Sequence, residues 1–160
     1  MGGLESASWW RWQGKKSTVE ESLSLAMKDF RRLLHAGSAG SFTWTWASGR
    51  KSFIGFFVSE SDDAPTLTLH YRWRDAEDIL IPIRLEPTPT QFGGRRWWFI
   101  CPLIVRGVPC ERGAGKLYLP PGVRYFGCRE CHDLTYRSCQ EAHQSERLLA
   151  DWTSMANSPR

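Results

Sequence analysis

Apolar residues between positions 17 and 37 recur every three or four residues, which is the period of an amphipathic helix. Ser17, followed three residues later by Glu20, matches a capping box, and Gly37 supplies a stop signal. The pattern predicts a helix over residues 17–37 that packs one apolar stripe on a core. The stripe consists of Val19, Leu23, Met27, Phe30 and Leu34.

From residue 42 to residue 85 the period becomes alternating, which is typical of strands with one buried face. Short polar turns separate the apolar segments and no helical pattern intervenes, so we expect antiparallel hairpins in a meander. Pro82 predicts that its strand lies at an edge or carries a bulge. The aligned apolar sets are Phe42, Trp44 and Trp46; Leu67, Leu69, Tyr71 and Trp73; and Ile79, Ile81, Ile83 and Leu85.

Beyond Cys101 the sequence consists of turn residues and short apolar segments, and from about Arg137 it predicts a second helix. The predicted fold class is α+β. An N-terminal helix packs on a four- or five-stranded antiparallel β-meander, which continues into a four-cysteine zinc ribbon and a C-terminal helix. The expected parts are residues 1–94 (helix and Trp-rich sheet), 95–136 (zinc ribbon) and 137–160 (C-terminal helix and tail), in one compact unit.

The cysteine spacing carries the strongest chemical signal in the chain. Cys101 and Cys110 are separated by eight residues, Cys128 and Cys131 by two, and seventeen residues lie between the pairs. This is the layout of two knuckles joined by a hairpin. Structural zinc takes four soft ligands in a tetrahedron, and thiolates at about 2.3 Å satisfy it. We therefore predict a structural Zn²⁺ held by these four cysteines.

Other roles for the thiols fit less well. A redox Cys-x-x-Cys normally opens a helix in a βαβ context, which this sequence lacks. Disulfides are disfavoured in the reducing cytosol, which is the compartment expected for a chain without a signal peptide or an apolar run of membrane-spanning length. A site of three cysteines and one histidine stays open as an alternative, in which Cys139 and His143 join Cys128 and Cys131. His132 is expected to support the site or to lie at the surface.

The net charge of +4 is concentrated near the cysteines. Residues 1–94 carry 11 basic and 11 acidic residues, whereas residues 95–129 carry six Arg and one Lys against a single Glu111, or +6. Aromatic residues are interleaved with these cations, and the mixture suits nucleic acid because guanidinium groups bind phosphate and aromatic faces stack on bases. The candidate binding residues are Arg95, Arg96, Arg106, Arg112, Lys116, Arg124, Arg129, Trp97 and Trp98.

We therefore expect a cytoplasmic, non-enzymatic, zinc-binding accessory protein that binds nucleic acid through this surface. The alternative is a protein-docking adaptor or inhibitor, because zinc ribbons and Trp-rich sheets also serve as rigid adaptors and tryptophans at strand spacing commonly form a core. No phosphate-binding loop, nucleophile elbow or zinc-protease motif occurs in the sequence. Acidic residues in the predicted turns, such as Asp62 and Asp75, are typical of solvated loops.

The stretch FGGRRWWFICPLIVRGVPCERGAGKLYLPPGVRYFGCRECHDLTYRSCQE, residues 92–141, resembles a family of bacterial and phage-associated zinc-ribbon proteins of uncharacterised function. With the upstream helix and the TWTW segment, the resemblance spans roughly residues 9–146. It implies Cys101, Cys110, Cys128 and Cys131 as metal ligands, and by analogy an accessory factor or inhibitor of a host nucleoprotein complex. Glu111 stands where relatives typically have glycine, and His132 where they have an aromatic residue.

Overall fold

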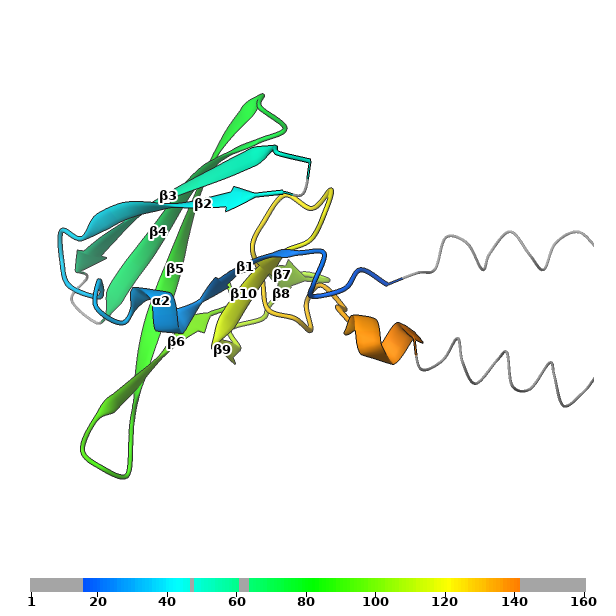
Figure 1. The fold of residues 1–160 in the computed structure, drawn as a ribbon. Coiled ribbons are helices and arrows are strands. Elements are labelled where there is room, and N and C mark those ends of the chain that lie inside the picture. Colours follow the sequence, from blue (N-terminus) through cyan, green and yellow to red (C-terminus); the bar gives the residue numbers. More distant parts are fainter. Residues whose placement is uncertain (1–15, 47, 61–63, 142–160) are drawn as a thin grey trace, which may run out of the picture.

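The computed structural model describes residues 16–46, 48–60 and 64–141 (Figure 1). This part of the chain is mostly β, with 51% of its residues in strands and 7% in two short helices. No helix within it is long and apolar enough to cross a membrane. The helices are α2 (Met27–Phe30) and a turn at residues 137–141. The strands are β1 (Leu23–Ala26), β2 (Ala39–Thr45), β3 (Lys51–Glu60), β4 (Pro65–Trp73), β5 (Glu77–Pro89), β6 (Arg95–Ile100), β7 (Ile104–Val105), β8 (Val108–Pro109), β9 (Gly113–Ala114) and β10 (Lys116–Leu119).

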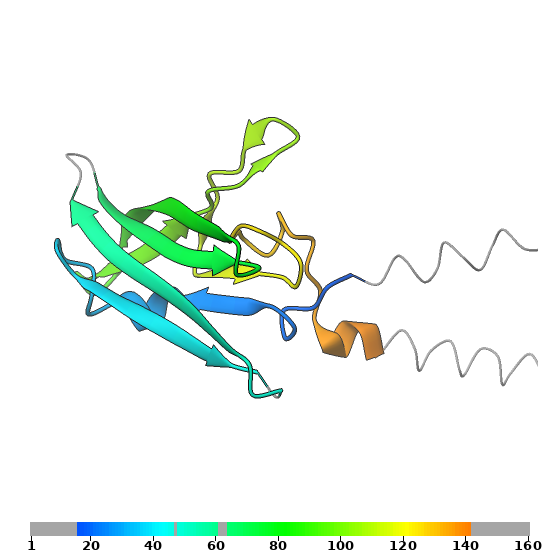
Figure 2. The same cartoon turned by 90° about the horizontal axis from the view of Figure 1, so that it is seen from above.

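Six strands form one curled antiparallel sheet in the order β2-β3-β4-β5-β6-β9. The long strand β5 belongs to both halves of this sheet, since residues 77–84 pair with β4 and residues 85–89 pair with β6. β1 pairs with β10 in a separate two-stranded sheet, and β7 pairs with β8 in a hairpin that projects from the body (Figure 2). Strands therefore pair across the predicted boundary at residue 94.

The alternating segments place one face of the curled sheet in the core. In β4 and β5 the aligned residues are buried except for half-buried Trp73, whereas Trp46, beyond the end of β2, is exposed. Phe30 of α2 is fully buried, and its ring centroid lies 5.0 to 5.6 Å from those of Phe42, Phe56 and Phe99. Each fully buried side chain of this size stabilises the fold by about 1.5–3 kcal/mol.

The strand that contains Pro82 is not an edge strand, since β5 lies between β4 and β6, but its segment around Pro82 is paired on one side only. At this position β5 pairs with β4 through Thr68, and the described part of β6 pairs with β5 only from Leu85 onward. On the side of β5 that faces away from β4, no strand is paired with Pro82, so the missing N–H of the proline removes no ladder hydrogen bond there.

The predicted helix over residues 17–37 is wrong, and the α+β fold class with it. Leu23 and Leu25 lie instead on β1, opposite Leu119 and Leu117 of β10, and only Met27–Phe30 is helical. Helix propensities differ by less than about 1 kcal/mol per residue. Burial of Leu25 against a distant strand contributes more than that, so tertiary pairing overrides the local period.

A capping box is nevertheless present, one residue later than predicted. The Thr18 N–H donates to Glu21 Oε2, and the Glu21 N–H donates to Thr18 Oγ1, each at 3.3 Å. The turn ends at once, because the Thr18 backbone forms a parallel bridge with Thr135 and the chain then enters β1. The local start signal was thus genuine, but no helix propagates from it.

Glu20 has a different role from the one predicted. Its Oε2 accepts a hydrogen bond of 3.1 Å from the N–H of Arg137, at the start of the turn at residues 137–141. The described part of the chain holds this single turn and not the predicted C-terminal helix. The apolar residues assigned to that helix, Leu148, Leu149 and Trp152, lie outside the described residues.

Candidate metal centre and basic groove

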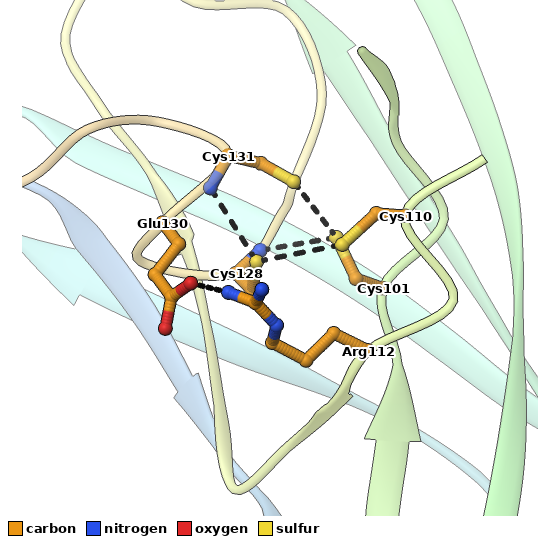
Figure 3. A network of polar contacts seen from close by, with 6 residues as sticks. All are labelled: Cys101, Cys110, Arg112, Cys128, Glu130 and Cys131. Atoms are coloured by element: carbon orange, nitrogen blue, oxygen red, sulfur yellow. Dashed lines mark hydrogen bonds and ion pairs between the residues drawn. The ribbon is translucent and has the colours of Figure 1, made fainter. Parts of the chain in front are cut away.

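Four cysteines from distant parts of the sequence meet at one point (Figure 3). Cys101 follows β6, Cys110 follows β8, and Cys128 and Cys131 lie in the loop after β10. Their four Sγ atoms all lie within 4.8 Å of one another, and none of them forms a disulfide. These cysteines could hold a metal ion.

The sulfur spacing matches a tetrahedral ion. Thiolates about 2.3 Å from a central zinc lie about 3.8 Å apart, since a tetrahedron's edge is about 1.63 times its radius. The Sγ atoms of Cys101 and Cys131 are 3.8 Å apart, and those of Cys110 and Cys128 are 3.9 Å apart. Each contact joins one member of the first pair to one member of the second, so both pairs contribute to the same site.

Backbone amides in the second knuckle point at the sulfurs. The N–H of Cys128 donates to Cys101 Sγ at 3.3 Å, and the N–H of Cys131 donates to Cys128 Sγ at 3.5 Å. Burial raises the pKa of the Cys101 and Cys131 thiols. Burial also acts to raise the pKa of Cys128, but the hydrogen bonds that it accepts, first from the Cys131 amide, lower it overall. A cation is what would compensate four thiolates gathered in this space.

Gly127 allows the two knuckles to approach each other. A Cβ at this position would lie 2.1 Å from Leu103 Cδ1 and 2.9 Å from His132 Nε2, and both contacts are too short to exist. Leu103 is fixed in turn, because its carbonyl accepts a hydrogen bond of 2.9 Å from the Cys110 N–H. The φ of Gly127 is not left-handed, so close packing and not backbone conformation is what requires glycine here.

Of the two alternative ligands, only Cys139 lies in the described part of the chain. Cys139 is exposed and is not part of the four-sulfur group, and His143 lies outside the described residues. His132 is half-buried beside Gly127, and burial lowers its pKa, so the ring is held neutral. Its Nε2 is buried without a hydrogen-bond partner in the described part of the chain. It packs beside the site and is not a member of the cluster.

An ion pair connects the two knuckles at the surface. Arg112, two residues after Cys110, pairs with Glu130, which lies between Cys128 and Cys131 (Figure 3). Both side chains are about half exposed, so the pair adds little to stability by itself. It does mark the place where the metal centre borders a groove.

A groove of about 850 Å³ lies beside the metal centre, and we call it the basic groove. Five of the seven predicted basic residues and both predicted tryptophans line it, together with Cys128 and Glu130. These predicted residues are Arg95, Arg96, Arg112, Lys116, Arg129, Trp97 and Trp98.

The other two predicted basic residues lie elsewhere. Arg106 occupies the turn of the β7–β8 hairpin, where its φ is 52°. Arg124 pairs with Glu77, and its guanidinium lies 5.9 Å from the centroid of the Trp73 ring. Neither lines the basic groove.

Sequence reasoning missed three residues of this groove. Lys28 and Arg31 enter it from α2 and the residue after it, and Tyr136 adds a ring. The first two were assigned to the polar face of a helix that does not form. Tyr118, which also lines the groove, is one of the aromatic residues that the sequence interleaves with the cations. Among the residues that line the groove, seven are basic (Lys28, Arg31, Arg95, Arg96, Arg112, Lys116 and Arg129) and one, Glu130, is acidic.

Two of the arginines lie over aromatic rings in the groove. The Arg96 guanidinium is 4.2 Å from the centroid of Trp98, and the Arg129 guanidinium is 5.6 Å from that of Tyr136. The rings and cations therefore share one surface, as base stacking with phosphate binding requires.

Comparison of the chain with protein-family models, with curated proteins and with solved structures found no match in any of the three.

Proposed function

We propose that the protein binds nucleic acid in the basic groove and that a structural zinc ion holds the walls of this groove together. The observation that carries the proposal is the convergence of seven basic residues with a single acidic one. Two of the seven come from the N-terminal region and five from the cysteine-rich region, so only the folded chain assembles this field.

The donor set favours a structural ion. Four thiolates complete a tetrahedron and leave no open position for a substrate or water, as a catalytic zinc would need. Tetrahedral sulfur also suits iron, so zinc is the part of the proposal that elemental analysis tests. We expect one zinc per chain in protein purified from zinc-replete cells, and iron or no metal in that preparation would contradict it.

Residues that neighbour the cysteines of the metal centre in sequence also line the groove. Arg112 and Lys116 follow Cys110 along one wall, and Arg129 and Glu130 lie between Cys128 and Cys131 on the other. A bound ion therefore fixes both walls against each other. A zinc ion with four thiolates carries a net negative charge, but the seven basic residues that line the groove carry a larger positive charge.

A protein-docking role has one observation of its own. The β7–β8 hairpin exposes Ile104, Val105 and Val108, with Ile104 at 68% and Val108 at 66%. An apolar tip on a metal-anchored hairpin suits an adaptor or inhibitor of a host nucleoprotein complex, the role that the phage-family resemblance suggested. Nothing in the structure shows what covers this tip, so nucleic-acid binding is the function proposed.

Salt dependence tests the proposed function. Fluorescence anisotropy with labelled oligonucleotides should show affinity falling between 50 and 200 mM salt, by about 50-fold for a single strand and about 150-fold for a duplex if four phosphates are contacted. Arg95→Ala should weaken binding equally across sequences and lower the salt slope by about one. Arg72→Ala, on another face and paired with Asp78 at 3.2 Å, is the matched control. Affinity that does not change with salt would contradict phosphate binding.

A further inference from the structure

Four aromatic rings line the basic groove, and this bears on which form of nucleic acid it can take. Trp97, Trp98 and Tyr118 are half-buried, and Tyr136 is 44% exposed. Paired bases stack on one another inside a duplex, so an aromatic face on a protein finds a partner mainly in unpaired bases. Trp97 also packs against the hydrophobic core, so the rings of Trp98, Tyr118 and Tyr136 are the ones that bear on base stacking.

Trp98 is held in place in the lining of the basic groove. Its Nε1–H donates to Thr88 Oγ1 at 3.0 Å, which fixes the orientation of the ring. Gly113 and Gly115 lie beside it: a Cβ on either residue would be 3.7 Å from the nearest Trp98 atom, in ordinary contact. Neither glycine has a left-handed φ, so the backbone does not require glycine there. Glycine at both positions keeps two methyl groups away from the half-buried indole, and the Arg96 guanidinium lies 4.2 Å from its ring centroid.

The edge of β6 also faces the groove without a partner. β9 pairs with the described part of β6 only at Phe99 and Ile100. On the other side, Pro87 and Pro89 of β5 stand opposite Trp97 and Arg95. Prolines have no N–H, so the hydrogen-bonded pairs of this ladder must be the alternate ones.

The peptide groups of Arg95 and Trp97 therefore point away from β5, toward the groove. Cys101 lies an even number of residues after Arg95 and Trp97, so its peptide group should point to the same side of the strand. Its N–H does point away from β5, because it donates to the Arg112 carbonyl at 2.9 Å. Free backbone N–H groups at such an edge can donate to phosphate oxygens, and free carbonyls can accept from base amino groups. A flexible single strand can follow an extended edge of this kind.

Sequence-specific readers of duplex DNA insert a helix or a two-stranded ribbon into the major groove. In the described part of the chain, the helices are one turn long, and the β7–β8 ribbon, with two residues in each strand, does not line the basic groove. The groove thus combines cations, rings and a free strand edge without an element that reads a duplex.

We infer that the basic groove binds single-stranded nucleic acid, with at least one unpaired base against Trp98 and phosphates along the edge of β6. This inference rests on the proposed function and specifies the substrate class of the same groove. DNA and RNA share the base and phosphate chemistry involved, so the test carries an arm for each.

The experiment compares a labelled single strand with a hairpin duplex of the same sequence, as DNA and as RNA, at fixed low salt. We expect at least tenfold tighter binding of one or both single strands, with quenching of tryptophan fluorescence. Trp98→Ala should weaken single-strand binding by roughly fivefold to 150-fold. Gly115→Ala, which places a methyl group against the indole and keeps every charge, should weaken it less while leaving the salt slope unchanged.

Gly55→Ala is the matched control, since its Cβ would lie at an ordinary 3.6 Å from the nearest atom on a different face. Metal content and circular dichroism report folding, and Gly115→Ala keeps the test decisive if Trp98→Ala does not fold. Duplex binding equal to or tighter than single-strand binding overturns this inference and leaves the proposed function standing. Absence of binding to every oligonucleotide, or poly-glutamate binding as tightly as the single strands, overturns the proposed function itself.

Discussion

Two grooves in the described part of the chain are built from similar residue types, but they differ in how many of their basic residues are paired with carboxylates. The second groove, of about 730 Å³, is lined by residues of β3 and β4 and by residues 119–123, and it contains four basic residues and two tryptophans. There Arg50 pairs with Asp75 at 3.8 Å, and Arg72 pairs with Asp78 at 3.2 Å. In the basic groove only Arg112 has a carboxylate partner among the residues that line it.

Composition alone would not separate these two surfaces, because arginine and tryptophan are abundant in both. What separates them is the neighbourhood of each cation. At the second groove, Asp75 of the β4–β5 turn and Asp78 of β5 lie next to arginines. Arg74 lies over Trp73, at 4.3 Å from the ring centroid. In the basic groove, cations of distant segments gather with little compensation, and a metal centre borders them.

Removal of the metal should have the largest effect and should separate the two grooves. Chelation, or Cys101→Ser, leaves buried thiols without their cation, so we expect residues 110–131 to lose hydrogen-exchange protection and nucleic-acid affinity to fall more than about 100-fold. The β3–β4 ladder, which contains no cysteine of the cluster, should keep its protection. Equal loss of protection in both regions would contradict this division.

Gly127→Ala should be the next most damaging change. The added methyl group would overlap Leu103 Cδ1 at 2.1 Å, and such overpacking costs about 1–3 kcal/mol of stability. Denaturant unfolding and metal-competition titrations should both report the loss. Leu103→Ala in the same chain should restore part of the metal affinity, and no recovery in the double variant would show that Leu103 is not the obstacle.

Glu130→Gln should tighten nucleic-acid binding by about twofold to fivefold at low salt. It removes the one acidic side chain among the residues that line the basic groove and frees Arg112. Asp78→Asn, which frees Arg72 near the second groove, is the counterpart and should change affinity little. Anisotropy titrations measure both, and a gain from Asp78→Asn as large as that from Glu130→Gln would mean that the two surfaces are equivalent.

The smallest predicted effect concerns Tyr71, on the second groove. Burial raises the pKa of Tyr71 above its usual value near 10, and its hydroxyl donates to the Arg124 carbonyl at 2.7 Å. The protonated ring therefore stabilises the fold fully below about pH 10, the unfolded-state pKa, and this contribution declines as the pH rises above it. Urea midpoints measured between about pH 8 and pH 11 should fall less steeply in Tyr71→Phe than in the parent.

The strands and the four-cysteine cluster could be predicted from the sequence because each depends on a short pattern. Ile79, Ile81 and Ile83 alternate and are all buried, and the Cys128–Cys131 spacing brings two sulfurs together within one loop. Cys101 and Cys110 reach the same point through a hairpin whose turn, Arg106–Gly107, has left-handed φ at both residues.

The N-terminal region could not be predicted because its partner lies far along the chain. Leu23 and Met27 fit a helical stripe, but Leu23 pairs with Leu119, about a hundred residues away, and local periodicity holds no information on that contact. The same wrong helix also hid two residues of the basic groove, because it placed Lys28 and Arg31 on a helix surface. Only pairing of β1 with β10 brings them to the cysteine-rich region.

The contact between Gly127 and Leu103 has a consequence for how this architecture can diverge. Any descendant that acquires a larger residue at 127 must shorten the side chain at 103 or spread its sulfurs apart, so the two positions should change together. A larger residue at 127 together with a smaller one at 103 would indicate that the arrangement of the four cysteine sulfurs has been kept during evolution.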